Sequence, residues 1–244
     1  MDVLFFFIII IGSKSSGNTS HVGGIVGRTE GKVSMTGNVN KAGGDVRLEV
    51  MSRNNDAETC SAGGIVGLSV ASAGTTMSNN TNRATVTSEC SGTQVMAGGI
   101  VGSVQGHLAM SDNINFGDVT MTGSESDIFA GGIVGAFNMH GSSGASTNAN
   151  VSLLRDKSFG AISSSARAGL LFASYGWNCY GNTTINDCVV GGSRQEGAND
   201  ATVITADNFA ANLWSYTRSG SVGTTLIQKN TTYGEASAYD TPTL

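Results

Sequence analysis

One pentapeptide, Gly-Gly-Ile-Val-Gly, occurs four times in this chain of 244 residues and constrains its fold more than any other feature. The copies begin at Gly23, Gly63, Gly98 and Gly131, so they are 40, 35 and 33 residues apart. Self-similarity at such spacings is typical of repeat architectures, in which each repeat buries its apolar face against its neighbours. The unequal intervals indicate loops of unequal length. A fifth, altered copy occupies residues 168–173, with the sequence Ala-Gly-Leu-Leu-Phe-Ala.

A second recurring segment lies between the glycine-rich blocks. It reads Met-Ser/Thr-x-Asn-x-Asn and begins at Met35, Met77 and Met110, and a weaker form at Ala145 keeps the two asparagines. Residues that recur at one place in successive repeats stack on their own copies when the repeats form parallel coils about 4.8 Å apart. We therefore predict buried ladders of isoleucine and of methionine, and an amide ladder at a corner. The Gly-Gly-Ile-Val-Gly blocks are expected to stack in one sheet and the Asn-x-Asn segments in another. The predicted structural residues are the paired glycines Gly23, Gly24, Gly63, Gly64, Gly98, Gly99, Gly131 and Gly132, the isoleucines Ile25, Ile65, Ile100 and Ile133, and the asparagines Asn38, Asn80, Asn113 and Asn148.

These columns predict an all-β fold, a parallel β-helix or β-solenoid of about five irregular repeats with a short helical or loop C-terminal cap. We expect an apolar N-terminal segment over residues 1–20, solenoid repeats over 21–192 and a capping segment over 193–244. Within the cap, residues 205–214 are predicted to form a short helix with Thr205 as its N-cap. Such a segment is needed because the open end of a solenoid must be covered.

The alternation of Ala-Gly-Gly-Ile-Val-Gly with an Asn-x-Asn segment resembles the GLUG-type repeat of bacterial surface proteins, which also accompanies some secreted immunoglobulin-cleaving peptidases. The resemblance covers roughly residues 22–192, and the fifth copy departs from the pattern. It implies a β-solenoid on an extracellular or bacterial cell-surface protein, with adhesion or spacing as its role and no established catalytic residues to transfer. The expected function is therefore a non-catalytic extracellular repeat module, an adhesin or spacer that binds glycans or cell-surface proteins.

The composition argues against several other classes of protein. Charged residues make up 13% of the chain, against about 25% in an ordinary globular domain, and Pro242 is the one proline. A chain with 39% apolar residues and a net charge of −5 does not have the composition of a disordered segment. With 13 Lys and Arg against 18 Asp and Glu and no basic run, a nucleic-acid partner is not expected.

The N-terminus carries an apolar run over residues 3–11. This run is too short to span a bilayer, and Asp2, its one flanking charge, is negative where a secretory signal has a positive one. We therefore expect no membrane span in this chain. The run is either the remnant of a signal whose start lies upstream or an internal strand exposed by an incomplete gene sequence, and in both cases a fragment is the favoured interpretation.

Four cysteines, Cys60, Cys90, Cys179 and Cys188, allow three pairings if all are oxidised. No Cys-x-x-Cys occurs and the three histidines are scattered, so neither a metal site nor a cofactor is expected. Cys188 takes the place of the first asparagine in its Asn-x-Asn corner. It is therefore predicted to be a small residue inside the stack.

Exposed aromatic residues are the candidates for ligand binding, because their rings can stack on the face of a sugar. These candidates are Trp177, Tyr180 and Trp214. For Trp214 a structural role, covering the open edge of the last coil, is the favoured alternative.

A polysaccharide-degrading enzyme is the second interpretation. Such a lyase or hydrolase needs clustered carboxylates, for hydrolysis two of them about 5 to 9.5 Å apart. Asp112 and Asp118 lie in one repeat, but the matching positions of the other copies are mostly Gly, Asn or Thr. No Ser-His-Asp signature is present either. We therefore predict no catalytic residues.

A flat threonine array that binds ice or another ordered surface is the third interpretation. The repeats predict that Val86 stacks on Val119 and Thr87 on Thr120. The first repeat places Arg47 in the threonine column, which breaks the array.

Overall fold

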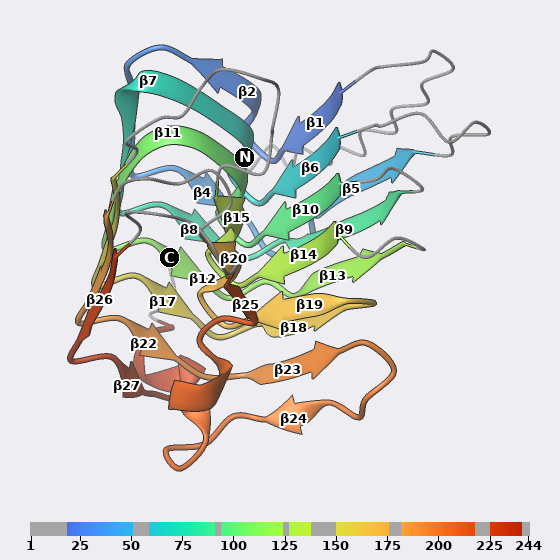
Figure 1. Ribbon diagram of the computed structural model, residues 1–244, viewed down its shortest axis with the longest axis vertical. Helices are drawn as coiled ribbons and strands as arrows, with labels where there is room; N and C mark the ends of the chain where they lie inside the picture. The colour runs from blue at the N-terminus through green and yellow to red at the C-terminus, as the bar shows by residue number, and fades with distance from the viewer. Residues whose placement is uncertain are drawn as a thin grey trace, which may run out of the picture.

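The computed structural model describes residues 19–50, 59–90, 94–123, 127–137, 150–175, 182–217 and 225–240. Almost all elements in these ranges are β-strands, which stack into four sheets along the long axis of the molecule (Figure 1). Strand pairing is parallel within the described residues, apart from one antiparallel pair near the C-terminus. The predicted all-β parallel solenoid is therefore confirmed.

Two of the sheets meet at the glycine-rich blocks. Sheet A contains β1 (Thr19–Gly23), β6 (Thr59–Gly63), β10 (Gln94–Gly98), β14 (Asp127–Gly131) and β19 (Arg167–Gly169). Sheet B contains β2 (Val26–Glu30), β3 (Val33–Thr36), β7 (Val66–Ser78), β11 (Val101–Ser111), β15 (Val134–Phe137), β16 (Val151–Leu154), β20 (Phe172–Tyr175), β21 (Asn182–Asn186), β25 (Tyr216–Thr217) and β26 (Thr225–Lys229).

The other two sheets follow the asparagine corner. Sheet C contains β4 (Val39–Asn40), β8 (Thr81–Asn82), β12 (Ile114–Asn115), β17 (Lys157–Ser158), β22 (Val189–Val190) and β27 (Thr232–Tyr233). Sheet D contains β5 (Asp45–Val50), β9 (Thr85–Cys90), β13 (Val119–Thr122), β18 (Ala161–Ser164), β23 (Ser193–Glu196) and β24 (Thr202–Val203).

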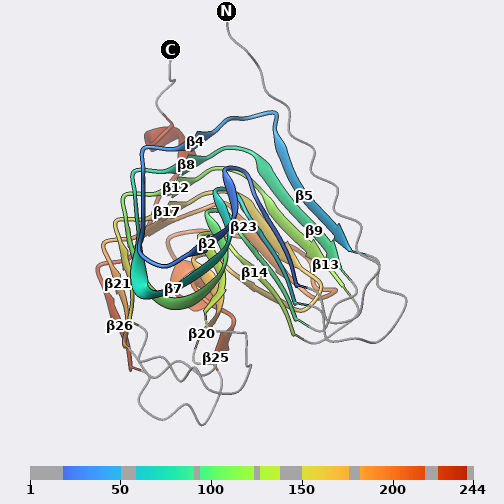
Figure 2. The ribbon, with the colours of Figure 1, turned by 90° about the horizontal axis from the view of Figure 1, so that it is seen from above.

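Each coil visits sheets A, B, C and D in that order, and the third coil does so through β10, β11, β12 and β13. Viewed from above, the chain folds back on itself within each coil, so that sheet A lies between sheet D and the first part of sheet B (Figure 2). This path creates two main apolar cores. One is lined by sheet B and the corner, and the other fills the space between sheets A and D.

The isoleucine ladder is present. Ile65, Ile100 and Ile133 are fully buried in the first core, and the backbone N–H of each donates to the carbonyl of the isoleucine-position residue in the next coil. The fifth copy of the block continues the isoleucine ladder, because Gly169 pairs with Gly131 and the carbonyl of Leu171 accepts a hydrogen bond from the backbone N–H of Ile133. Ile25 is an exception: its side chain is 46% exposed, because the first coil has no described strand stacked above it.

The methionine ladder is also present and is longer than expected. Met35 pairs with Met77 and Met77 with Met110, and the column continues as Leu153 and Ile185. These five members are buried, so an aliphatic side chain can take the place of methionine. Gln228, which follows Ile185 in β26, is exposed.

The amide ladder is confirmed at Asn38, Asn80 and Asn113, but its next member is Asp156. β16 pairs with β11 through Leu153 and Met110, so the corner three residues later places Asp156 beneath Asn113. Asn148, the residue predicted for this position, lies outside the described residues. Cys188 follows Asp156 and is buried in the stack, as predicted.

The glycine-rich block forms the junction between sheets A and B, since Gly98 ends β10 and Val101 begins β11. Our expectation that the blocks lie in one sheet was therefore wrong. Close packing explains the paired glycines. A Cβ atom on Gly99 would overlap the side-chain amide of Asn115 and the carbonyl oxygen of Gly132. The second glycine of the first three blocks thus makes room for the second asparagine of the corner, and Gly132 in the fourth block makes room for Ser158.

The stacks continue past Gly192 into β26 and β27, and β24 runs antiparallel to β23 at the edge of sheet D. Instead of the helix predicted over residues 205–214, there is one 3-10 turn, η1 (Phe209–Asn212), with Asn208 and not Thr205 as its N-cap. A second such turn is η2 (Ala236–Ala238). Below β19, the guanidinium of Arg194 donates from Nε to the carbonyl of Ala168 at 2.6 Å. That contact satisfies an edge carbonyl of sheet A.

Candidate functional site

The three aromatic candidates are not brought together by the described structure. Trp214 packs its ring on Phe172, with centroids 5.8 Å apart and planes 6° from parallel, next to the first core. One face of its ring is therefore occupied by the protein, which matches the structural alternative for this residue. Trp177 and Tyr180 lie outside the described residues.

The two carboxylates of the enzyme interpretation both have structural partners. Asp112 accepts two hydrogen bonds from Arg155, from Nε and Nη2, each at 2.7 Å. These bonds hold the pKa of the Asp112 carboxyl below its usual value, although burial acts in the opposite direction. Asp118 accepts from the backbone N–H of Ala161 at 2.8 Å. Both carboxylates thus link their coil to the following one.

The threonine column of sheet D has the predicted register. Val86 pairs with Val119 and Thr87 with Thr120, and Arg47 pairs with Thr87 at the top of the column. The Nη2 atom of Arg47 also lies 3.9 Å from Oε2 of Glu89, so charged groups occupy the top of the threonine column.

A different exposed surface is more regular, and our reading of the sequence missed it. On the outer side of sheet B, two neighbouring columns hold uncharged side chains from β3 to β21, and seven of the ten are serine or threonine. We call this surface the hydroxyl face. Its columns are Ser34, Thr76, Ala109, Ser152 and Thr184, and Thr36, Ser78, Ser111, Leu154 and Asn186.

Strand alternation turns these side chains outward. Met35, Met77 and Met110 point into the core, so the residues before and after each of them point away from it. Neighbouring members of a column are about 4.8 Å apart across strands, and the two columns are about 6.6 Å apart along each strand. Thr36 and Ser78 already share a hydrogen bond of 3.0 Å between their hydroxyls. The Ser or Thr that follows each methionine of the repeated motif was the signal available in the sequence.

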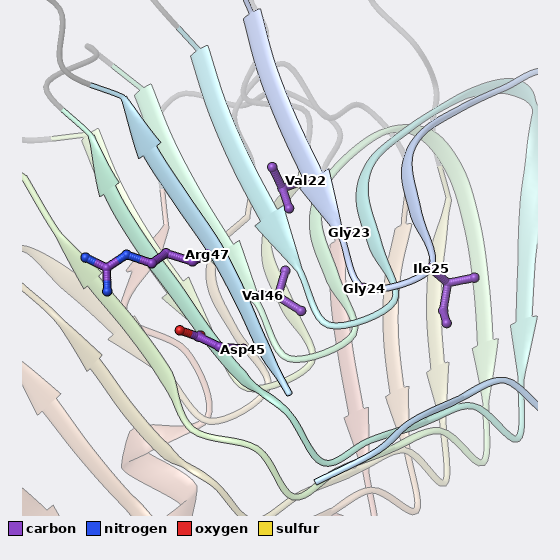
Figure 3. A pocket seen from close by; sticks show the side chains of 7 residues that line it. All are labelled: Val22, Gly23, Gly24, Ile25, Asp45, Val46 and Arg47. Carbon is purple, nitrogen blue, oxygen red and sulfur yellow. The ribbon is translucent and has the colours of Figure 1, made fainter. Parts of the chain in front are cut away.

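A small apolar cavity of about 160 Å³ lies at the free edge of the first coil. Figure 3 shows Val22 and Val46 beside the gap between β1 and β5, with Asp45 and Arg47 on the other side of β5. In lower coils the corresponding space is filled by the core between sheets A and D. Ligand pockets usually occupy about 300 to 1,000 Å³, so this cavity is better described as the unfilled end of that core.

Titratable groups do not gather elsewhere in the described part of the chain in a way that would hold a metal: no three His, Cys, Asp or Glu residues group together there. Those same residues include no helix with the length and apolar character to cross a lipid bilayer. No protein-family model, curated protein or solved structure matches this chain.

Proposed function

We propose that the chain is a non-catalytic extracellular repeat module of the GLUG type, a surface adhesin that binds an uncharged glycan along the hydroxyl face. The hydroxyl face is the observation that carries the proposal. Eight of its ten side chains on the five stacked strands from β3 to β21 are hydrogen-bonding groups without charge, and Ala109 and Leu154 are the two apolar members. The charged Lys229 follows Asn186 only in the next strand, β26. An extended polysaccharide has hydroxyls along its length and no charge to neutralise, so its chemistry matches that surface.

The extracellular location is supported by the disulfide that joins Cys60 to Cys90. Both cysteines are buried between sheets A and D, where the bond links the start and the end of the second coil. Disulfides persist mainly in oxidising environments, such as the cell exterior. A structural spacer is the alternative role within the same class, because stacked coils build length.

The adhesin role can be tested by co-sedimentation with insoluble polysaccharides and by a glycan array. Thr76→Lys and Ser152→Lys each place a long charged side chain on the hydroxyl face, and we expect either to weaken binding at least about tenfold. Thr87→Lys is the matched control, since Thr87 stands on the outer side of sheet D. Product analysis after incubation would detect an enzyme.

Equal loss of binding in the Thr87→Lys control would contradict the assignment of the hydroxyl face. An absence of binding to every polysaccharide would contradict the adhesin role and favour the spacer. Release of oligosaccharides that is abolished by Asp112→Asn or Asp118→Asn would overturn the non-catalytic assignment.

A further inference from the structure

The asparagine ladder follows one hydrogen-bonding rule from coil to coil. The side-chain oxygen Oδ1 of Asn80 accepts from the backbone N–H and from Nδ2 of Asn38, at 3.0 and 2.8 Å. Asn113 accepts from Asn80 in the same way and at the same distances. Each Nδ2 also donates to a backbone carbonyl of the methionine column in the coil above, from Asn80 to Met35 at 3.1 Å and from Asn113 to Met77 at 3.0 Å.

Asp156 accepts the two hydrogen bonds from the coil above, as Asn80 and Asn113 do in their coils. It has no side-chain N–H that could donate to a carbonyl of the methionine column. Its Oδ1 accepts from the backbone N–H and Nδ2 of Asn113, at 2.9 and 2.8 Å. Its Oδ2 is completely buried and has no hydrogen-bond partner among the residues that the structure describes. One coil further down, the Sγ of Cys188 has the matching acceptor, the carbonyl oxygen of Leu153 at 3.7 Å, and a second one in the carbonyl oxygen of Asn186 at 3.6 Å. By the same rule, the carbonyl that Asp156 should meet is that of Met110.

A carbonyl oxygen can only accept a hydrogen bond, and an ionised carboxylate can only accept one as well. Asp156 completes the ladder only if Oδ2 carries a proton, which it can donate as the amide does at Asn80 and Asn113. We propose that Asp156 is a neutral carboxylic acid in the folded protein and that its proton makes this corner a pH-sensitive joint between the third and fourth coils. Loss of the proton leaves a buried negative charge that has no hydrogen to donate to the neighbouring carbonyl oxygen, and the joint loosens.

The surroundings of Asp156 favour the protonated form. Burial raises the pKa of its carboxyl to about 7, against the opposing effect of the hydrogen bonds from Asn113. Of the charged groups nearby, Asp112 in the coil above also raises this pKa, and Lys157 on β17 lowers it. Arg155 is already paired with Asp112. Burial likewise raises the pKa of the Cys188 thiol below it to about 12, so that neighbour stays neutral.

The direction of the pH effect follows from the raised pKa. An unfolded aspartate titrates near pH 3.9, so between about pH 4 and pH 7 the folded protein holds a proton that the unfolded chain has released. The contribution of Asp156 to stability is therefore complete below about pH 4 and declines as the pH rises to about 7. Asp112 behaves in the opposite way, because its hydrogen bonds with Arg155 lower its pKa.

The test compares the wild-type protein with Asp156→Asn, which restores the amide that the ladder uses at Asn80 and Asn113. Chemical denaturation at several pH values between about 4 and 8 gives the folding equilibrium constant of each. We expect the ratio of the variant to the wild type to rise by up to about tenfold per pH unit between about pH 4 and pH 7 and then to level off. Asn199→Ala, which changes an exposed side chain that does not titrate, should leave that ratio constant.

A second measurement does not depend on the variant's stability. At about pH 6 the infrared spectrum of the wild-type protein in heavy water should contain the carbonyl band of a protonated carboxyl, and this band should fade as the pH rises. A wild-type spectrum with no such band would overturn the proposal. So would an Asp156→Asn variant whose stability stays in constant ratio to the wild type across the pH range.

Discussion

Arg155 donates two parallel hydrogen bonds to the carboxylate of Asp112 in the preceding coil. Both residues have a left-handed backbone, with φ of 55° for Arg155 and 58° for Asp112. They belong to a corner column in which every described member has a positive φ: Gly37, Asn79, Asp112, Arg155, Asp187 and Asn230. Gly, Asn and Asp adopt this conformation readily, whereas arginine does so at a cost. The bidentate pair helps to hold Arg155 in place.

Asp112→Asn should remove this pair while keeping a residue that tolerates the left-handed backbone. Because Arg155 lowers the pKa of Asp112 in the folded protein, the pair stabilises the protein above the unfolded aspartate pKa of about 3.9. That advantage over the variant should disappear as the pH falls below about 4, the reverse of the trend at Asp156. Unfolding midpoints at several pH values would show it. Asp200→Asn, an exposed position outside the corner, is the control.

Ile100→Ala should destabilise the solenoid by about 2 to 5 kcal/mol, because it empties a fully buried position in the middle of the isoleucine ladder. Ile25→Ala is a matched control in the same column. Its side chain is 46% exposed, so its cost should stay below about 1 kcal/mol. Equal effects of the two substitutions in chemical denaturation would contradict the stacking that we describe.

Asn113→Ala should cost about 1 to 3 kcal/mol in the free energy of unfolding. The substitution removes the acceptor that Asn80 uses twice, at 2.8 and 3.0 Å, inside a buried corner. Asn199→Ala, at an exposed asparagine, should change the stability by no more than about 0.5 kcal/mol. A neutral Asn113→Ala would mean that the amide ladder contributes nothing to the stability of the corner.

The ladders could be predicted from the sequence where chemical identity repeats. Isoleucine, methionine and the first three asparagines recur in kind, so their stacking follows from the spacing alone. Asp156 was missed because the ladder changes from an amide to an acid at this position. The weaker motif at Ala145 keeps both asparagines, so Asn148 was aligned with the ladder in its place.

The hydroxyl face was missed for a related reason. Outward positions do not pack into a core, so Ser34, Thr76 and Ala109 share a column without sharing an identity. The exposure of Ile25 depends on what lies above the first coil, and no local pattern encodes that.

Gly99→Ala should destabilise the protein by at least about 1 to 3 kcal/mol, because an added Cβ would overlap Asn115 and the backbone of Gly132. These nearest atoms belong to the asparagine corner and to the glycine pair of the next coil. Because both are held by hydrogen bonds between coils, neither can shift to make room for the added Cβ. Gly44→Ala is the control, since a Cβ there would have its nearest neighbour at 3.4 Å. Its effect on the unfolding midpoint should be small.

The disulfide between Cys60 and Cys90 gives the last prediction. The two residues are 30 positions apart and join β6 to β9 across the second core, so reduction should cost about 3 to 4 kcal/mol by releasing a closed loop in the unfolded chain. Unfolding followed with and without a reductant would measure this loss. A Cys60→Ala, Cys90→Ala double variant should be less stable than the oxidised protein and should no longer respond to the reductant. If the reductant left the unfolding midpoint of the wild-type protein unchanged, the disulfide within the second coil would be contradicted. The main support for an oxidising, extracellular environment would then be lost.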